Sequence, residues 1–206
     1  MSISLLESTA FERQEIVPLT VEQYHGMIAA GILEEGEPIE LLDGLLVHKS
    51  RGEGMTTNPV HALVVSKLNL LLTAALGSFG CHVRVQNPVT LPPRDEPEPD
   101  LAIVQGLPAD FALRHPGPAD VTCVIEVAGA SLDRDRTTKK RIYTAAGIPQ
   151  YLIVNLAGSR VELFEEPDSA RGQYRQRVEE LAGDEEIGLL LPENRRLMVS
   201  AADCLP

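Results

Sequence analysis

The feature that most constrains the fold is an apolar run from Val121 to Val127, in which Glu126 is the only charged residue. No other charged residue occurs between Asp120 and Asp133. An apolar run of this length is typical of a buried strand. A carboxylate in such a strand is costly unless it is paired, hydrogen-bonded or bound to a metal. Glu126 is therefore the first functional candidate, with a structural ion pair or a water-facing edge position as the alternative.

The surrounding pattern predicts an α/β fold with a mixed sheet. A capping box at Thr20 and a Pro after Asn58 mark the starts of two helices. An Asp43-Gly44 pair between apolar residues predicts a hairpin over 39–47, and residues 50–57 are predicted to form a loop. The predicted helices cover about 20–31, 58–77 and 133–146, the predicted strands cover 81–91, 101–104, 121–127 and 151–155, and an antiparallel hairpin is predicted in the tail from 161 onward.

The core order is therefore helix, strand, strand, strand, helix, strand. The step from the 121–127 strand through a helix to the 151–155 strand predicts a parallel pair. The earlier strands are joined by non-helical links, so we expect them to be antiparallel. Residues 1–17 are predicted to be an N-terminal extension and residues 18–206 a single domain.

Composition narrows the class of protein. The net charge of −12 argues against a protein that coats nucleic acid non-specifically, because that requires a large basic surface. The 3 cysteines are widely spaced, which favours a reducing compartment over a disulfide framework. The N-terminus lacks a signal pattern, and we expect no apolar run near the roughly 18 residues of a membrane span. These features predict a cytoplasmic protein that has no membrane partner.

Asp100 is the second acidic candidate, because it directly precedes the apolar strand 101–104. If this strand runs antiparallel beside the 121–127 strand, Asp100 and Glu126 meet at one end of the sheet. Two carboxylates that share a small site repel each other unless a cation joins them. Mg²⁺ is typically held by one or two carboxylates together with water and substrate phosphate. The sequence thus predicts a Mg²⁺ or Mn²⁺ site here.

Lys139 is the third candidate. On the predicted helix, Asp135, Lys139 and Tyr143 are four residues apart and share one face with Ile142, so Lys139 is expected to point toward the sheet. The alternative is an Asp135–Lys139 pair on the helix surface. Such a pair contributes only about 0.3–0.5 kcal/mol, so replacing Lys139 is expected to leave stability almost unchanged.

Together these residues resemble the pattern of a known protein family. The chain resembles the PD-(D/E)xK nuclease superfamily and, more closely, a large bacterial family of restriction-endonuclease-like proteins. The stretches that carry it are Glu40-Leu41-Leu42-Asp43-Gly44, His61, Glu98-Pro99-Asp100-Leu101-Ala102-Ile103-Val104, Val124-Ile125-Glu126-Val127, Asp135-x3-Lys139-x3-Tyr143, and Gly147-Ile148-Pro149-Gln150-Tyr151. The likeness covers roughly residues 18–165.

The resemblance implies a nuclease-like fold in which Asp100, Glu126 and the backbone carbonyl of Val127 are metal ligands. It also implies that Asp100, Glu126 and Lys139 are catalytic, and that Glu40, His61, Asp135 and Tyr143 support them. The superfamily's lysine two residues after the glutamate is Ala128 here, and Lys139 takes its place from the helix. Gly129 and Leu152 stand where the family is expected to have Ser and Trp.

The predicted function is a Mg²⁺-dependent endonuclease that hydrolyses phosphodiester bonds in nucleic acid, with DNA favoured over RNA. A basic strip of Arg134, Arg136, Lys140 and Arg141 is a candidate for positioning the phosphates, with a solvated helix face as the alternative. A duplex target favours a two-fold homodimer. Two other functions stay open: a nuclease-fold binding module without activity, and a metal-dependent hydrolase of a small phosphoester.

Overall fold

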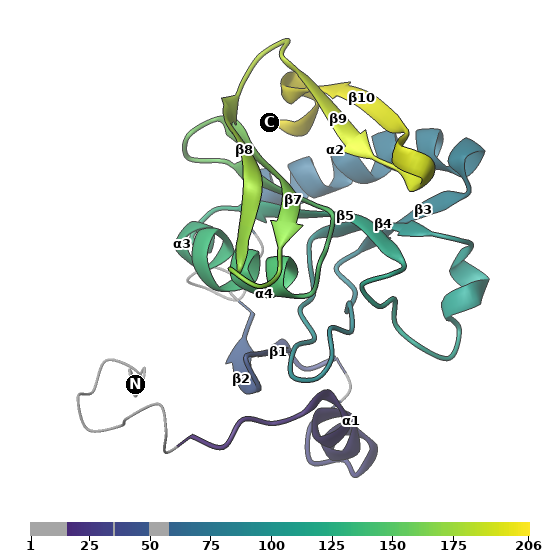
Figure 1. The fold of residues 1–206 in the computed structure, drawn as a ribbon, viewed down its shortest axis with the longest axis vertical. Helices are drawn as coiled ribbons and strands as arrows, with labels where there is room; N and C mark the ends of the chain where they lie inside the picture. The colour runs from purple at the N-terminus through teal and green to yellow at the C-terminus, as the bar shows by residue number, and fades with distance from the viewer. Residues whose placement is uncertain (1–15, 35, 50–57) are drawn as a thin grey trace.

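The centre of the molecule is a six-stranded mixed sheet, seen here in a computed structural model that describes residues 16–34, 36–49 and 58–206. Its strand order is β3-β4-β5-β6-β7-β8 (Figure 1). β5 and β6 are parallel, and the other neighbouring pairs are antiparallel, which confirms the predicted mixed sheet and its parallel step. The strands are β3 (Cys81–Val85), β4 (Leu101–Gln105), β5 (Val121–Ala128), β6 (Gln150–Asn155), β7 (Arg160–Asp168) and β8 (Gln173–Leu181).

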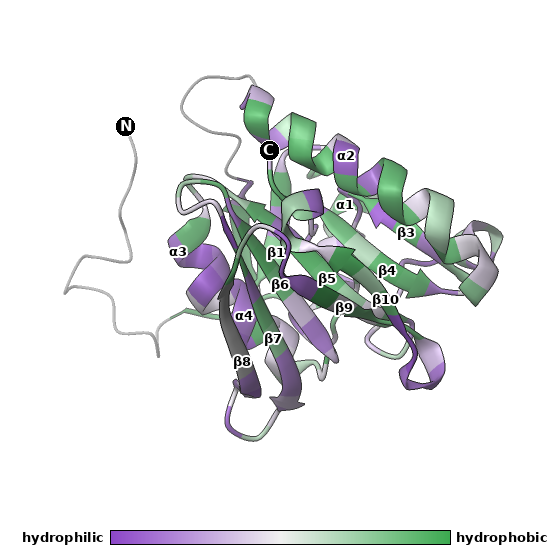
Figure 2. Cartoon of the chain, turned by 90° about the horizontal axis from the view of Figure 1, so that it is seen from above, coloured by the Kyte–Doolittle hydropathy of each residue, from purple (hydrophilic) through white to green (hydrophobic). Residues whose placement is uncertain are grey.

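Each face of the sheet carries its own apolar layer (Figures 1 and 2). On one face the sheet packs against helix α2 (Pro59–Leu76) and the hairpin of β9 (Glu186–Leu190) and β10 (Arg196–Ser200). On the other it packs against α3 (Leu132–Arg134), a π-helical turn (Asp135–Lys139) and α4 (Lys140–Ala145). Because successive residues of a strand point to opposite faces, Ile125 of β5 joins the first layer and Val124 the second.

Helix α2 corrects one expectation from the sequence. Residues Pro59–Phe79 have a mean hydropathy of 1.6 over an 18-residue window, so by length and composition they pass the test for a membrane span. The expectation that no run is long and apolar enough is therefore wrong. Leu68, Leu72 and Leu76 of this helix are fully buried against the sheet, although only 28% of the window is buried.

A small subdomain is attached below the sheet. It consists of α1 (Val21–Ala29) and the hairpin of β1 (Ile39–Leu42) and β2 (Leu45–His48). The hairpin turns at Asp43 (φ 55°) and Gly44 (φ 75°), the two positive φ angles of the predicted Asp-Gly turn. The Glu96 amide donates to the Leu41 carbonyl, which ties β1 to the segment between β3 and β4 and fixes the hairpin near the sheet end.

Several predicted boundaries differ from the structure. β3 ends at Val85 rather than at residue 91, because Gln86 adopts a left-handed φ of 49° and turns the chain away. The helix predicted over 133–146 is interrupted by the π turn. The tail hairpin is confirmed as β7–β8, but the β9–β10 hairpin was not predicted. The predicted loop at 50–57 and residues 1–15 of the predicted extension lie outside the described residues.

The burial of α2 predicts a difference between two leucines of the same helix. Leu72 is 0% exposed, whereas Leu70 is 72% exposed. Leu72→Ala should lower the free energy of unfolding by about 2–5 kcal/mol, because it removes buried contacts and leaves a cavity. Leu70→Ala should leave it nearly unchanged. Urea unfolding of the two variants measures this, and equal losses would contradict the packing of α2 on the sheet.

Candidate active site

Asp100 and Glu126 meet at one end of the sheet. The register of β4 and β5 pairs Leu101 with Ile125, which places Asp100 directly before β4 and across from Glu126. Both Leu101 and Ile125 lie in the layer under α2. Since neighbours along a strand point to opposite faces, Glu126 lies on the side of α3 and α4. The predicted meeting of the two carboxylates therefore follows from strand pairing alone.

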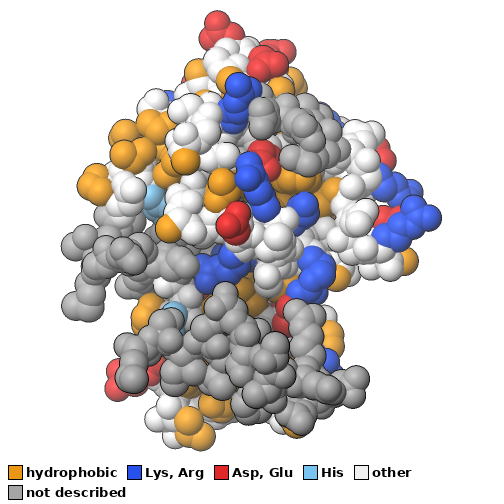
Figure 3. Space-filling model, turned by 90° about the vertical axis from the view of Figure 1, so that its left-hand side faces the viewer, with side chains coloured by type: hydrophobic (Ala, Val, Ile, Leu, Met, Phe, Trp, Pro, Cys, Tyr) orange, Lys and Arg blue, Asp and Glu red, His pale blue; other side chains and the backbone are white. Residues whose placement is uncertain are grey.

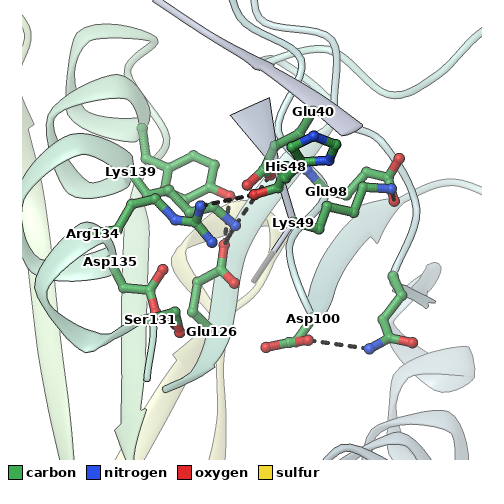
Figure 4. Close-up of polar contacts among 12 residues, drawn as sticks. Glu40, His48, Lys49, Glu98, Asp100, Glu126, Ser131, Arg134, Asp135 and Lys139 are labelled. Carbon is green, nitrogen blue, oxygen red and sulfur yellow. Dashed lines mark hydrogen bonds and ion pairs between the residues drawn. The ribbon is translucent and has the colours of Figure 1, made fainter. Parts of the chain in front are cut away.

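Glu126 is held by two donors from the helical segment that follows β5. The Lys139 ammonium donates to Glu126 Oε1 at 2.9 Å (Figure 4). The Tyr143 hydroxyl donates to the same oxygen, also at 2.9 Å. Lys139 Nζ also lies 3.3 Å from Glu40 Oε2, and all four side chains are buried. The interpretation of Lys139 as one half of a surface pair with Asp135 is therefore wrong.

The π turn shapes the helical side of this cluster. Both Asp135 and Lys139 are buried although they lie at the two ends of the turn. Within the turn the Asp135 carbonyl accepts the Lys140 amide proton, and the Tyr151 hydroxyl donates to the same carbonyl at 3.1 Å. Single π turns within helices occur frequently at functional sites.

Asp100 is held by a different set of donors. Its Oδ2 accepts the Val127 amide proton at 2.8 Å, and its Oδ1 lies 3.1 Å from His61 Nε2 and 3.3 Å from Gln86 Nε2. The N–H and C=O of one strand residue point to the same side, so the Val127 carbonyl also points toward the Asp100 side. His61 reaches this position from the first turn of α2.

A cavity of about 400 Å³ lies among these side chains. Six of the residues predicted from the sequence line it with side chains, and Val127 also lines it. Tyr143 does not line the cavity but acts on it through its bond to Glu126. The six are Glu40, His61, Asp100, Glu126, Asp135 and Lys139. The catalytic and supporting roles of these residues stay predictions, but their gathering in one place is observed.

The cluster carries more carboxylates than cations, and the pKa shifts reflect this. Burial raises the pKa of Glu126 to about 8, opposed by Lys139 and aided by Asp135 and Asp100. Burial alone would lower the pKa of Lys139, but the carboxylates of Glu126 and Glu40 raise it instead. An added cation would relieve this imbalance, because it favours the ionised form of the carboxylates.

Asp100 differs from Glu126 in its electrostatics. Burial alone would raise the pKa of Asp100, but the hydrogen bond and charge of His61, with the Val127 amide, bring it below its usual value. The hydrogen bond to Asp100 in turn raises the pKa of His61. The lowered pKa keeps Asp100 ionised at neutral pH. The pKa of Glu126 stays raised even beside Lys139, so a further cation is needed to favour its ionised form.

The donor set fits a hard divalent cation. Among the described residues, no three His, Cys, Asp or Glu side chains stand together as a ready-made metal cluster. The available donors are carboxylate oxygens from Asp100 and Glu126 and the Val127 carbonyl, all at the same cavity. Mg²⁺ is commonly bound through one or two carboxylates while it keeps several waters.

The four residues of the predicted basic strip make different contacts in the structure. Arg136 pairs with the buried Glu162 at 2.6 Å, Arg141 pairs with Asp43, and the Lys140 ammonium lies 5.0 Å from the ring centroid of Phe164. Of the four basic residues, Arg134 alone lines the cavity. Lys and Arg side chains nevertheless gather on the face that carries α3 (Figure 3). Arg134 is therefore the member of the strip best placed to meet a phosphate in the cavity.

Some cavity residues were not predicted. Lys49 lines the cavity and pairs with Glu98, Ser131 donates to Asp135, and Gln86 donates to Asp100. Lys49 follows β2 and Gln86 follows β3, so both stand at strand ends, where functional side chains often gather. The strand-end position was the only signal in the sequence that could have indicated them.

Two carboxylates from adjacent antiparallel strands and a lysine from the following helix, gathered at one end of a mixed sheet, define a restriction-endonuclease-like protein. Residues 21–200 match the sequence profile of the Uma2 family, described as "Putative restriction endonuclease". The chain belongs to this family. The resemblance expected from the sequence is confirmed, and with it a nuclease-like function.

The fold is also similar to a solved structure. The crystal structure of "a putative nuclease belonging to DUF820" from Anabaena variabilis matches with a TM-score of 0.66 and 14% sequence identity. The match covers 91% of this chain and 97% of that one. At this identity the likeness concerns the fold. The chain matches none of the curated proteins.

The raised pKa of Glu126 predicts how stability depends on pH. Burial raises the pKa of Glu126 to about 8 in the folded protein, whereas a glutamate in the unfolded chain has its usual pKa of about 4.5. Stability should therefore fall as pH rises between these values, because the folded state binds more protons. Glu126→Gln should flatten this fall. Urea unfolding from pH 5 to pH 8 measures it, and parallel curves for both proteins would count against a protonated Glu126.

The pairing of Lys139 predicts a large stability effect where the sequence predicted almost none. Lys139→Met should cost about 3–5 kcal/mol, because it leaves buried carboxylates without their cation. Lys140→Met is the matched control and should cost about 0.5–1 kcal/mol, from its contact with Phe164. Chemical denaturation of both variants tests this. Similar small losses would restore the surface-pair interpretation.

Proposed function

We propose that this chain is a Mg²⁺- or Mn²⁺-dependent endonuclease that hydrolyses phosphodiester bonds in nucleic acid, with DNA as the preferred substrate. The observation that carries the proposal is the arrangement of Asp100, Glu126 and Lys139 around one cavity. Membership of a family described as "Putative restriction endonuclease" supports it. Members of this class of nuclease generally work with divalent metals.

In this proposal Asp100, Glu126 and the Val127 carbonyl hold the cation. The chemistry that a divalent cation supplies at such a site is polarisation of a phosphoryl oxygen and a lower pKa for water. Lys139 fixes the position of Glu126 and offsets negative charge as it builds up on the phosphoryl group. Tyr143 and Glu40 hold Glu126 and Lys139 in place, and His61 does the same for Asp100.

Substrate phosphates would be positioned by the cations at the cavity. Lys49 and Arg134 both line it, and Arg134 donates to the His48 carbonyl at 3.2 Å, which holds the guanidinium beside β2. Phosphate contacts of this kind position a backbone without reading its sequence. The overall net charge of −12 is compatible with this, because the cations that matter are local.

The size of the cavity favours one alternative, a hydrolase of a small phosphoester. A volume of about 400 Å³ falls within the range of about 300–1,000 Å³ that is typical of small-molecule sites. The two functions differ in substrate. The endonuclease proposal expects cleavage of DNA and of a phosphodiester such as bis(p-nitrophenyl) phosphate, and no hydrolysis of the monoester p-nitrophenyl phosphate.

Cleavage assays test the proposal directly. The purified protein should nick or cut DNA with Mg²⁺ or Mn²⁺ and lose this activity with EDTA. Asp100→Asn and Glu126→Gln should each lower the rate by at least about 10²-fold, the usual effect of removing one preorganised charge contact. Glu162→Gln is the matched control, because Glu162 is equally buried but pairs with Arg136 away from the cavity.

Thermal shifts separate a nuclease from a binding module. Mn²⁺ should raise the melting temperature of the wild type and of Glu162→Gln, because a ligand that binds the folded state stabilises it. Glu126→Gln should lose this rise. Wild-type protein that cuts neither DNA nor RNA with either metal, and that shows the same metal shift as Glu126→Gln, would favour a binding module.

We also propose that the protein acts as a two-fold homodimer in the cytoplasm. A duplex target presents two strands, and two-fold symmetry is the commonest arrangement of soluble homo-oligomers. The 3 cysteines are free and buried, which suits a reducing compartment. Light scattering at high protein concentration tests the dimer. A monomer would argue against cutting both strands in one encounter.

A further inference from the structure

Asp135 presents an unusual carboxylate at the cavity. Its side chain is 1% exposed, and its Oδ2 accepts a short hydrogen bond from the Ser131 hydroxyl at 2.6 Å. Its Oδ1 is buried and has no hydrogen-bond partner in the described part of the chain. A buried oxygen without a donor is costly, so such an atom calls for a small ligand. The site that it borders is the cavity lined by Glu126 and Lys139 (Figure 4).

The other carboxylates discussed above, and Lys139, are engaged by the protein. Asp100 accepts from Val127 and from His61, and Glu126 Oε1 accepts from Lys139 and Tyr143. Lys139 is itself held between Glu126 and Glu40, which leaves it suited to fixing charge rather than to taking a proton. Asp135 Oδ1 differs from these carboxylate oxygens, since the described residues supply it with no donor, and His61 Nδ1 is a ring nitrogen at the same cavity that likewise has no partner among them. A water molecule is the simplest donor that fits.

We propose that Asp135 is the general base of the reaction and that its Oδ1 accepts the proton of the attacking water. This inference rests on the proposed function. The water oxygen forms the new bond to phosphorus, its proton passes to Asp135 Oδ1, and the bond from phosphorus to the leaving oxygen breaks. The leaving oxygen takes a proton from solvent, and Asp135 later releases its own to solvent. Ser131 acts as a positioning residue that fixes the carboxylate through Oδ2.

The electrostatics of Asp135 suit this role. Burial raises its pKa, while the charge of Lys139 and the hydrogen bond from Ser131 oppose the rise. A carboxylate with a raised pKa is a better proton acceptor near neutral pH than an exposed one. Asp135 is also the carboxylate that acts most strongly on Glu126, ahead of Asp100 and Glu40. The Asp135 charge therefore acts directly on Glu126, the carboxylate that is proposed to bind the cation.

The test compares two isosteric variants of the same helical segment under single-turnover conditions. Asp135→Asn should cleave DNA about 10²–10⁴-fold more slowly than the wild type, which is the usual contribution of a general base. Its Mn²⁺ affinity, measured by calorimetry on the apo protein, should be unchanged. Asp133→Asn makes the same chemical change at an exposed position two residues earlier and should cleave at the wild-type rate. Ser131→Ala, which keeps the carboxylate but removes its donor, should give a smaller loss than Asp135→Asn.

The outcomes separate this inference from the proposed function. If Asp135→Asn loses Mn²⁺ affinity together with activity, Asp135 is a metal ligand and the inference is wrong. If Asp135→Asn cleaves at the wild-type rate, Asp135 is not the base and the inference is wrong. Should Asp135→Asn unfold, the smaller loss in Ser131→Ala with unchanged Mn²⁺ affinity still supports the inference, and a wild-type rate in Ser131→Ala overturns it. A wild type without activity on any nucleic acid overturns the proposed function and this inference with it.

Discussion

The Lys139 ammonium lies between two buried carboxylates, Glu126 and Glu40, and the geometry of the site depends on this contact. A charged Glu126 in the middle of β5 could not be retained without a partner, because burial strongly disfavours its ionised form. The contact joins the distant strand β1, which supplies Glu40, to two neighbouring segments: β5, which supplies Glu126, and the helical segment after it, which supplies Lys139. The small hairpin subdomain is therefore part of the site.

The cluster is arranged for a function rather than for stability. Five carboxylates, those of Glu40, Glu98, Asp100, Glu126 and Asp135, border one cavity, and Lys139 is shared between two of them. Replacing buried ion pairs with apolar residues is often neutral or stabilising, so a core built only for stability would not need them. The raised pKa of Glu126 and the oxygen of Asp135 without a partner among the described residues are consistent with the proposed binding of a cation and a water.

Much of the site could be predicted from the sequence because the pairing of neighbouring strands can be inferred from patterns that lie close together in the chain. Once β4 and β5 are antiparallel neighbours, Asp100 and Glu126 must meet, and the four-residue spacing places Lys139 on the sheet side of its helix. The partners of Lys139 could not be predicted in this way. Glu40 lies nearly 100 residues earlier, and only the three-dimensional position of the β1–β2 hairpin brings it to Lys139. For the same reason the surface pair with Asp135, the local interpretation, was wrong.

The elements of the fold likewise divide into those predicted from local sequence patterns and those set by tertiary contacts. The periodic pattern predicted α2 and the mixed sheet, whereas the end of β3 depended on a left-handed Gln86 that no pattern indicates. The β9–β10 hairpin was missed because its stability comes from packing on the sheet beside α2 rather than from a turn signal. The π turn between α3 and α4 likewise follows from tertiary contacts, including the bond from Tyr151 to the Asp135 carbonyl.

The central claim is that Asp100 and Glu126 together form a divalent-cation site. The most direct measurement is a crystal structure of the wild type soaked in Mn²⁺, with anomalous diffraction to locate the metal. The account predicts an anomalous peak between the carboxylates of Asp100 and Glu126, with the Val127 carbonyl among the ligands. A well-ordered structure with no peak in the cavity, or with Mn²⁺ bound only elsewhere on the acidic surface, would contradict it.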